Sequence, residues 1–192
     1  MPQTSSVPSP LLVRFAGGDE GEWEIHRSNA VIGAPLPVAN RLAVTTTTHT
    51  ATDAAWSLKG VVSNMRYTTS KEATLLVREQ PPLSRPEAVM AALIPIRKSA
   101  TWWAMAQDER RAIYEERSRH TSVGLEYLPR IARRLHHSRD LGEPFDFLTW
   151  FEFAPEHEPA FDELVERLRA SEEWNYVERE VDIRLKRRLI SP

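Results

Sequence analysis

The stretch RHTSVGLEYLPRIARRLHHSRD, residues 119–140, decides the fold because a helical pattern ends in it and an extended pattern begins. A helix is predicted over Trp102–His120, where apolar residues recur at steps of three or four and His120 continues the same stripe. A strand is predicted over Pro129–His137, where an alternation of two places Arg133 on the apolar side. The spacing therefore puts a histidine and an arginine on the inner sides of two successive elements.

The elements on either side of this stretch complete a β-α-β-β-α-β order. Strands are predicted over Ala91–Lys98, Asp146–Phe153 and Val177–Lys186, and a second helix runs from Glu156 to about Trp174. This order is typical of the ferredoxin-like α+β fold, an antiparallel sheet with both helices on one face. The other face must also be covered, often by a second such domain or a second subunit, and the β-rich N-terminal part of the chain looks like a shortened partner for this sheet.

The last of these strands has the clearest alternation. Its odd positions are mostly apolar, as in Val181, Ile183 and Leu185, and its even positions are all charged. We therefore expect one face to pack in the core and the other to face water.

The chain divides near residue 85, where Pro81 and Pro82 interrupt it. Short β-like runs separated by turn residues precede this point, at Leu11–Phe15, Trp23–His26, Arg41–Val44, Trp56–Tyr67 and Leu75–Arg78. We expect residues 1–85 to form a truncated, β-rich N-terminal subdomain and residues 86–192 to form the C-terminal ferredoxin-like domain.

Composition narrows the classes of function. With 192 residues, 41% of them hydrophobic and 27% charged, the chain is globular and can form a sizeable core. Its net charge of -2 gives no reason to expect nucleic acid or a membrane surface as a partner. The start of the chain lacks a basic segment and a long apolar run, so no signal peptide is expected and a cytoplasmic protein is predicted.

His120 and Arg133 carry the clearest chemical signal. A buried guanidinium is costly unless a carboxylate or a bound anion pairs with it. A group that holds iron, with an anion-binding group opposite, would suit a haem pocket. Two simpler roles stay open: a core histidine bonded to a carbonyl, and an internal ion pair of Arg133 with Glu152 or Glu172. Because the chain has no cysteine, thiolate ligands and a thioether-linked haem are excluded.

Further candidate residues are ambiguous on spacing alone. Lys98 ends a strand, Trp102 and Trp103 could be ordinary core, and Tyr67 lies at a strand end. Of the two carboxylates at the end of the second helix, periodicity favours Glu172 as the inward one. The P-loop, HExxH, GxSxG and GxGxxG motifs are all absent.

Three segments of the chain resemble the chlorite dismutases, in particular their short, dimeric branch with a truncated N-terminal half. They are IPIRKSATWW (Ile94–Trp103), HTSVGLEYLPRIARRLHHSRDLGEPFDFLTWFEF (His120–Phe153) and ASEEWNYVEREVDIRLKR (Ala170–Arg187). GGDEGEW (Gly17–Trp23) and LKGVVSNMRY (Leu58–Tyr67) match more loosely. The resemblance implies a homodimer.

The resemblance also implies a non-covalent haem b in the C-terminal domain. His120 matches the proximal iron ligand, and Glu173, rather than Glu172, matches the carboxylate that accepts a hydrogen bond from it. Arg133 matches the distal arginine, and Trp103 packs beside the haem. The positions that hold the haem propionates are matched by Lys98, Trp102 and Tyr67.

The activity implied by the resemblance is haem-dependent conversion of chlorite, a small anion, to chloride and dioxygen with formation of an O–O bond. Two alternatives differ in class. The coproheme decarboxylases share the fold, but an arginine is not expected at their distal position, so Arg133 argues for chlorite. The second alternative is a dimeric α+β protein that binds haem weakly or not at all and has no enzymatic activity.

Overall fold

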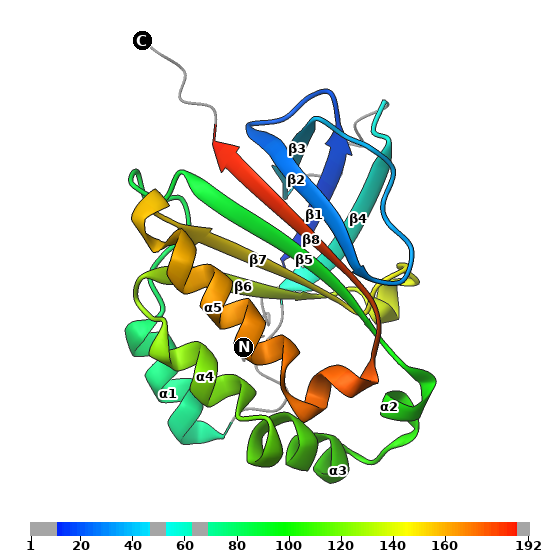
Figure 1. Ribbon diagram of the computed structural model, residues 1–192, viewed down its shortest axis with the longest axis vertical. Helices are drawn as coiled ribbons and strands as arrows, with labels where there is room; N and C mark the ends of the chain where they lie inside the picture. Colours follow the sequence, from blue (N-terminus) through cyan, green and yellow to red (C-terminus); the bar gives the residue numbers. More distant parts are fainter. Residues whose placement is uncertain (1–10, 47–52, 63–68, 188–192) are drawn as a thin grey trace, which may run out of the picture.

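The computed structural model describes residues 11–46, 53–62 and 69–187, and in this part of the chain eight antiparallel strands close into one barrel (Figure 1). The strands follow one another around the barrel in the order β1-β3-β2-β8-β5-β7-β6-β4. They are β1 (Leu12–Gly18), β2 (Trp23–Ile32), β3 (Arg41–Thr45), β4 (Trp56–Val62), β5 (Met90–Lys98), β6 (Ile131–His137), β7 (Phe147–Phe153) and β8 (Val177–Arg187).

Helical segments lie along one side of the barrel, against the strands of the C-terminal half (Figure 1). None of the helices in the described part of the chain has the length and apolar composition needed to cross a bilayer. The longer segments are α1 (Ser70–Glu79), α2 (Ala100–Ala104), α3 (Gln107–Arg111), a π-helical turn (Ala112–Arg117), α4 (His120–Glu126) and α5 (Glu158–Arg169), and short 3₁₀ turns cover Arg139–Leu141, Pro155–His157 and Glu172–Tyr176.

The barrel interior is the first of two apolar cores, and both halves of the chain contribute to it. Trp23 on β2 packs edge-on against Trp150 on β7, with ring centroids 5.2 Å apart. Leu93 on β5 lies opposite Trp150 in the strand register. The sheet face that was expected to need a second domain or subunit is therefore covered by N-terminal strands of the same chain. Buried residues of this core include Val13, Phe15, Trp23, Leu42, Leu58, Leu93, Trp150, Ile183 and Leu185.

The second core lies between the sheet and the helices. On α5, Phe161, Leu164 and Leu168 are spaced three or four residues apart and are all buried, as the sequence predicted. Phe161 stacks on Phe153 of β7 at 4.7 Å between ring centroids. This layer packs α5 against the sheet.

The N-terminal half differs from expectation at one predicted strand and extends beyond the described residues at another. Leu75–Arg78 was predicted as a strand, but it belongs to helix α1, because a short apolar run fits either structure and its flanking residues here favour a helix. The strand predicted over Trp56–Tyr67 is β4 as far as Val62, and residues 63–68, which include Tyr67, lie outside the described residues.

The single helix predicted over Trp102–His120 is wrong, because the chain forms α2, α3 and a π-helical turn there. Arg119 then adopts a left-handed conformation with φ of 53°, which ends the helical path. His120 consequently opens α4 instead of closing the preceding helix. The apolar stripe correctly predicted that His120 faces inward. However, His120 belongs to α4 and not to the helix that was predicted.

The charged face of β8 faces water only at its two ends, where Glu178 and Lys186 are exposed, whereas its middle part is buried, contrary to expectation. Glu180, Asp182 and Arg184 are buried under α5. Arg169 of α5 donates to Glu180 at 2.6 Å and to Asp182 at 2.9 Å, and Arg184 pairs with Asp182 as well. Each buried charge therefore has a partner of opposite sign, which is the condition for burying it.

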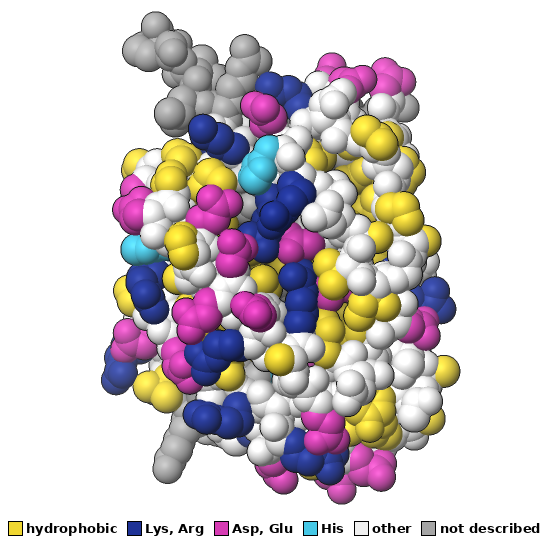
Figure 2. All heavy atoms as spheres, viewed as in Figure 1, with side chains coloured by type: hydrophobic (Ala, Val, Ile, Leu, Met, Phe, Trp, Pro, Cys, Tyr) yellow, Lys and Arg dark blue, Asp and Glu magenta, His cyan; other side chains and the backbone are white. Residues whose placement is uncertain are grey.

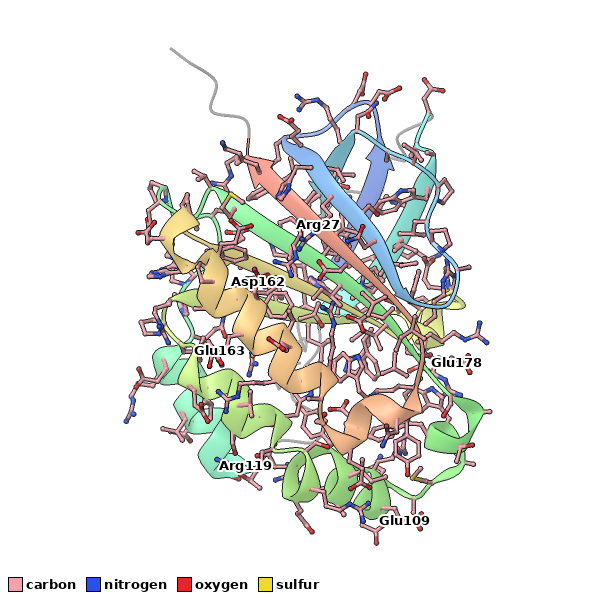
Figure 3. The ribbon with its side chains drawn as sticks, in the orientation of Figure 1. Arg27, Glu109, Arg119, Asp162, Glu163 and Glu178 are labelled. Atoms are coloured by element: carbon pink, nitrogen blue, oxygen red, sulfur yellow. The ribbon has the colours of Figure 1, made fainter. Side chains whose placement is uncertain are left out.

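This network reaches the surface at the outer edge of α5. Arg184 donates to Asp162 at 2.7 Å, and the side chain of Asp162 is 56% exposed. Asp162 on α5 and Arg27 on β2 are labelled in Figure 3 on either side of the network. In Figure 2, basic side chains follow the line between α5 and β2, with acidic ones beside them over α5.

Candidate functional site

A cavity of about 430 Å³ lies between the helices and the sheet. Its sheet wall comes from β5, β6 and β7 with a contribution from β8, and its helix wall comes from α1, α2, the π-helical turn, α4, α5 and the Glu172–Tyr176 turn. The lining is mainly apolar and aromatic, with a few charged groups among it, as in a binding site for a flat or largely apolar ligand. Four of the charged or titratable side chains are Lys98, His120, Arg133 and Glu173.

His120 stands on the helix wall and is hydrogen-bonded to a buried carboxylate. Its Nδ1 lies 2.6 Å from Oε2 of Glu173, and the Nζ of Lys98 lies 2.7 Å from Oε1 of the same group. Burial alone would raise the pKa of the Glu173 carboxyl, but the charges and hydrogen bonds of His120 and Lys98 lower this pKa to about 2. Glu173 is therefore an ionised acceptor at neutral pH.

This pairing fixes the tautomer of His120. Since an ionised carboxylate can only accept, Nδ1 carries the proton, and in the neutral ring this leaves Nε2 with a free lone pair. The ring is 24% exposed and lines the cavity, so its outer nitrogen is accessible to a ligand there. A carboxylate bonded to the inner nitrogen is the usual partner of a metal-binding histidine, because it orients the ring and raises its basicity.

Two aromatic rings lie parallel to the His120 ring. Tyr114, in the π-helical turn, stacks at 4.5 Å between centroids, and Trp174 stacks at 6.4 Å. Burial, followed by the charge of Glu173, raises the pKa of Tyr114 to about 12, so this phenol stays neutral. The sequence interpretation missed both rings, since Tyr114 and Trp174 occupy segments read as parts of regular α-helices.

The choice between the two adjacent glutamates depends on local geometry. Glu173 is buried and bonds His120, whereas Glu172 is 39% exposed and pairs with Arg117 at 3.2 Å. The sequence predicted a helix as far as about Trp174, and the periodicity of that helix turned Glu172 inward. The helix ends at Arg169 and a 3₁₀ turn follows, which changes the phase by which side chains face inward.

Arg133 stands on the sheet wall, on β6. Its carbonyl accepts a hydrogen bond from the Gln80 side chain at 2.8 Å, and its guanidinium reaches across to α4. There it lies against Gly124, where an added Cβ would come within 1.8 Å of Nη1. Burial lowers the pKa of Arg133, and the nearby Tyr114 and Glu115 act in the opposite direction.

The internal ion pair considered for Arg133 is not formed. Glu152 instead accepts hydrogen bonds from the Trp150 indole at 2.8 Å and from the backbone of Ser84. Within the described residues, the guanidinium of Arg133 has no carboxylate partner. A half-buried, charged donor without such a partner is suited to a bound anion.

The two adjacent tryptophans have different surroundings. Trp102 lines the cavity and is 1% exposed, and its indole N–H has no hydrogen-bond partner in the described part of the chain. Trp103 is not among the lining residues. It stacks on Phe147, which lines the cavity, and donates to Asp146 at 3.0 Å.

Lys98 was expected to hold a haem propionate. In the structure its ammonium is buried and bonded to the side chain and the carbonyl of Glu173, at 2.7 and 3.4 Å, and it lies 4.6 Å from the centroid of the Trp102 ring. Lys98 therefore stabilises the ionised form of the carboxylate behind His120. Its place at the end of an inward strand face was predictable, but its partner lies 75 residues away in the sequence.

The fold and the site together define a class of protein. It is an α+β barrel with a cavity between helices and sheet, a carboxylate-bonded histidine on one wall of the cavity and, among the described residues, an arginine without a carboxylate partner on the other. The chain belongs to the chlorite dismutase family, whose model matches residues 36–189. This confirms the resemblance found in the sequence.

Individual relatives agree with the family assignment. The dimeric chlorite dismutase of Nitrobacter winogradskyi is 55% identical, with a TM-score of 0.86 over 91% of this chain and 99% of the other. A chlorite dismutase of Candidatus Nitrospira defluvii, solved with imidazole, is 29% identical with a TM-score of 0.55, over 79% of this chain and 56% of the other. The curated chlorite dismutase of Ideonella dechloratans is 37% identical over 62 residues, which are 32% of this chain and 20% of that protein.

Proposed function

We propose that this chain is a haem b-dependent chlorite dismutase, a chlorite O2-lyase that converts chlorite to chloride and dioxygen. The observation that carries the proposal is the cavity with the His120–Glu173 pair on its helix wall and Arg133 on its sheet wall. Family membership points to the same activity.

The residues of the cavity fit a haem. The free Nε2 of His120 would bind the iron, and the absence of cysteine requires that the group be held without a thioether link. The indole N–H of Trp102, which has no partner among the described residues, suits a propionate carboxylate, for which Tyr67 is the second proposed donor. Trp103 would support this wall through Phe147.

Glu173 and Lys98 act on the proposed iron ligand, His120, through its Nδ1 atom. An ionised Glu173 holds the Nδ1 proton of His120 and makes the ring a stronger electron donor to iron. Lys98 keeps this carboxylate ionised and fixed, since its ammonium lies at 2.7 Å in a buried environment. We therefore assign Lys98 to the His120 side of the site rather than to a propionate.

Arg133 provides a positive charge and hydrogen-bond donors for a small anion. When bound, haem supplies the iron centre at which the Cl–O bonds of chlorite are broken and the O–O bond is formed. Arg133 would bind and orient chlorite and hold the chlorine-containing anion in the cavity until dioxygen has formed. In the net reaction ClO2⁻ gives Cl⁻ and O2, so no external reductant is consumed.

Oxygen release from chlorite by the haem-loaded protein, measured with an oxygen electrode, tests the activity. His120→Ala should lose the histidine-ligated Soret spectrum, and a variant that kept it would rule out His120 as the ligand.

Arg133→Ala should release hypochlorite that a trapping reagent detects, with faster bleaching of the haem. Arg130→Ala, at an exposed position just before β6, is the matched control. Equal trappable hypochlorite from Arg133→Ala and the parent would contradict the retention role.

The same assays separate the alternatives. A coproheme decarboxylase would convert the propionates of iron coproporphyrin and release no oxygen from chlorite. A protein without enzymatic activity would do neither, and one that binds no haem would also show no Soret band.

We also propose the finer organisation that the sequence indicated. The chain would consist of a truncated N-terminal ferredoxin-like subdomain, residues 1–85, and a C-terminal ferredoxin-like haem domain, residues 86–192, in the cytoplasm. The Nitrobacter relative is a dimer, which supports a homodimer here. Sedimentation velocity of the purified protein tests this assembly.

A further inference from the structure

The π-helical turn of Ala112–Arg117 brings a carboxylate to the start of α4, whose first residue is His120. Oε2 of Glu115 accepts a hydrogen bond from the backbone N–H of Thr121 at 2.7 Å. Oε1 accepts from the backbone N–H of Ser122 at 3.3 Å and from its hydroxyl at 2.5 Å. Both oxygens of Glu115 are therefore bonded to the two residues that follow His120.

Helix α4 depends on such support for its orientation. It has only seven residues, too few to be stable by itself, and the first N–H groups of any helix lack partners within it. Arg119, at the cap position, makes no side-chain hydrogen bond to the helix and adopts a left-handed backbone conformation. Glu115 supplies from outside the cap that residue 119 does not provide.

The π-helical turn explains how Glu115 reaches this position. A regular helix over this segment would place Glu115 on its polar side with Glu116, but the exposure of Glu115 is only 9%. Its own carbonyl accepts the N–H of Arg119 at 2.9 Å, so backbone and side chain both hold the break before α4. The preceding residue, Tyr114, stacks on the His120 ring. Single turns of π-helix are often found at functional sites.

We infer that Glu115 is a positioning residue, which fixes the direction in which His120 presents Nε2 to the cavity by capping α4. The inference rests on the proposed role of His120 as the iron ligand. Glu173 sets the rotation of the ring through Nδ1, whereas Glu115 sets the backbone from which the ring projects. The two carboxylates therefore act on different parts of the same residue.

The test compares Glu115→Ala and Glu115→Gln with Glu116→Ala, an exposed neighbour with the same change of charge. In the haem-loaded proteins, transfer of haem to excess apomyoglobin gives the rate of haem loss, and resonance Raman of the ferrous form gives the iron–histidine vibration. For Glu115→Ala we expect haem loss about tenfold faster, the size of one lost cap, with a shifted or broadened vibration. Glu115→Gln should be intermediate, because its amide oxygen still accepts one N–H, and Glu116→Ala should match the parent.

A readout without haem keeps the inference separate from the proposed function. In the haem-free protein, the Nδ1 proton of His120 should give a downfield NMR signal from its bond to Glu173, and Glu115→Ala should shift or broaden it. A parent protein that shows this signal but no histidine-ligated spectrum would refute the ligand role alone. An unchanged signal, vibration and rate in Glu115→Ala would overturn the inference.

A stability control distinguishes positioning from general loosening. Val13→Ala removes two methyl groups from the barrel interior, away from the cavity lining. If Val13→Ala lowers the unfolding temperature and changes haem loss and the vibration as much as Glu115→Ala does, Glu115 acts only through stability and the inference is wrong.

Discussion

Gly124 lies one helical turn after His120, and the lack of a side chain there makes room for the guanidinium of Arg133. In Gly124→Ala, the new Cβ would lie 1.8 Å from the present position of Nη1, so the flexible end of Arg133 must move. If Arg133 binds the anion as proposed, we expect kcat/KM for chlorite to fall roughly tenfold, about 1.4 kcal/mol of transition-state stabilisation. Steady-state oxygen release measures this change.

The double variant Gly124→Ala/Arg133→Ala provides the control. Because Gly124 is expected to act through Arg133, adding Gly124→Ala to Arg133→Ala should cause little further loss. Full additivity of the two effects would show that Gly124 affects the reaction by another route.

His136 should make the protein sensitive to mild acid. It is 2% exposed in the barrel, its Nδ1 lies 3.0 Å from the carbonyl of Leu148, and burial lowers its pKa from 6.5 to about 4. Between pH 6.5 and 4, His136 therefore binds a proton in the unfolded chain but stays neutral in the folded protein. The free energy of unfolding should fall by up to about 3 kcal/mol as pH falls from 6.5 to 4.

Denaturant unfolding at a series of pH values measures this slope. His136→Asn retains a donor for the Leu148 carbonyl but has no proton to gain, so its curve should be flatter in this window, although the protein is less stable overall. Equal slopes in the variant and the parent would mean that another group is responsible.

For His120 and Arg133, the sequence predicted that the side chains face inward, but not what they contact. The apolar stripe placed His120 in the interior, and the strand alternation placed Arg133 on the cavity side. Neither pattern identified Tyr114 or Glu115, because a π-helical turn rotates both residues away from the directions of an α-helix. Tyr67 stays a prediction, since it lies outside the described residues.

At the scale of elements, we expect the ion network between α5 and β8 to contribute to the stability of the fold. Asp182 is 4% exposed and pairs with both Arg169 and Arg184. Asp182→Ala would leave two largely buried guanidinium groups short of a partner, so we expect a loss of about 3 kcal/mol in chemical denaturation. Asp162→Ala, at the exposed end of the same network, should cost less than about 1 kcal/mol. Similar losses from both changes would argue that the buried charges are not mutually stabilising.

The same strand shows why alternation alone misled the sequence interpretation. A charged face normally indicates exposure, because an isolated buried charge is costly. On β8, Arg169 of α5 supplies the opposite charge for Glu180 and Asp182, so the face can be buried. This pairing joins residues on different elements, and no local pattern in either segment contains it.

For the whole molecule, the closed barrel means that the two halves of the chain depend on each other. The division near residue 85 follows composition, yet Trp23 and Leu42 of the first half and Trp150 and Ile183 of the second share one core. The N-terminal strands thus take the place of the covering domain or subunit that the sheet requires. We therefore expect one cooperative unfolding transition, seen alike by tryptophan fluorescence and far-UV circular dichroism.

The closed barrel also predicts how residues 86–192 behave when they are produced without the N-terminal half. Without the N-terminal strands, Leu93, Trp150, Ile183 and Leu185 would be exposed on one sheet face, a patch that soluble monomers rarely tolerate. This fragment should aggregate or lack fixed tertiary structure, as near-UV circular dichroism and gel filtration would show, and it should bind haem poorly. Co-expression with residues 1–85 should restore the barrel and the Soret band. A monomeric, folded fragment that binds haem through His120 would show instead that the haem domain is independent and that the N-terminal strands serve another purpose.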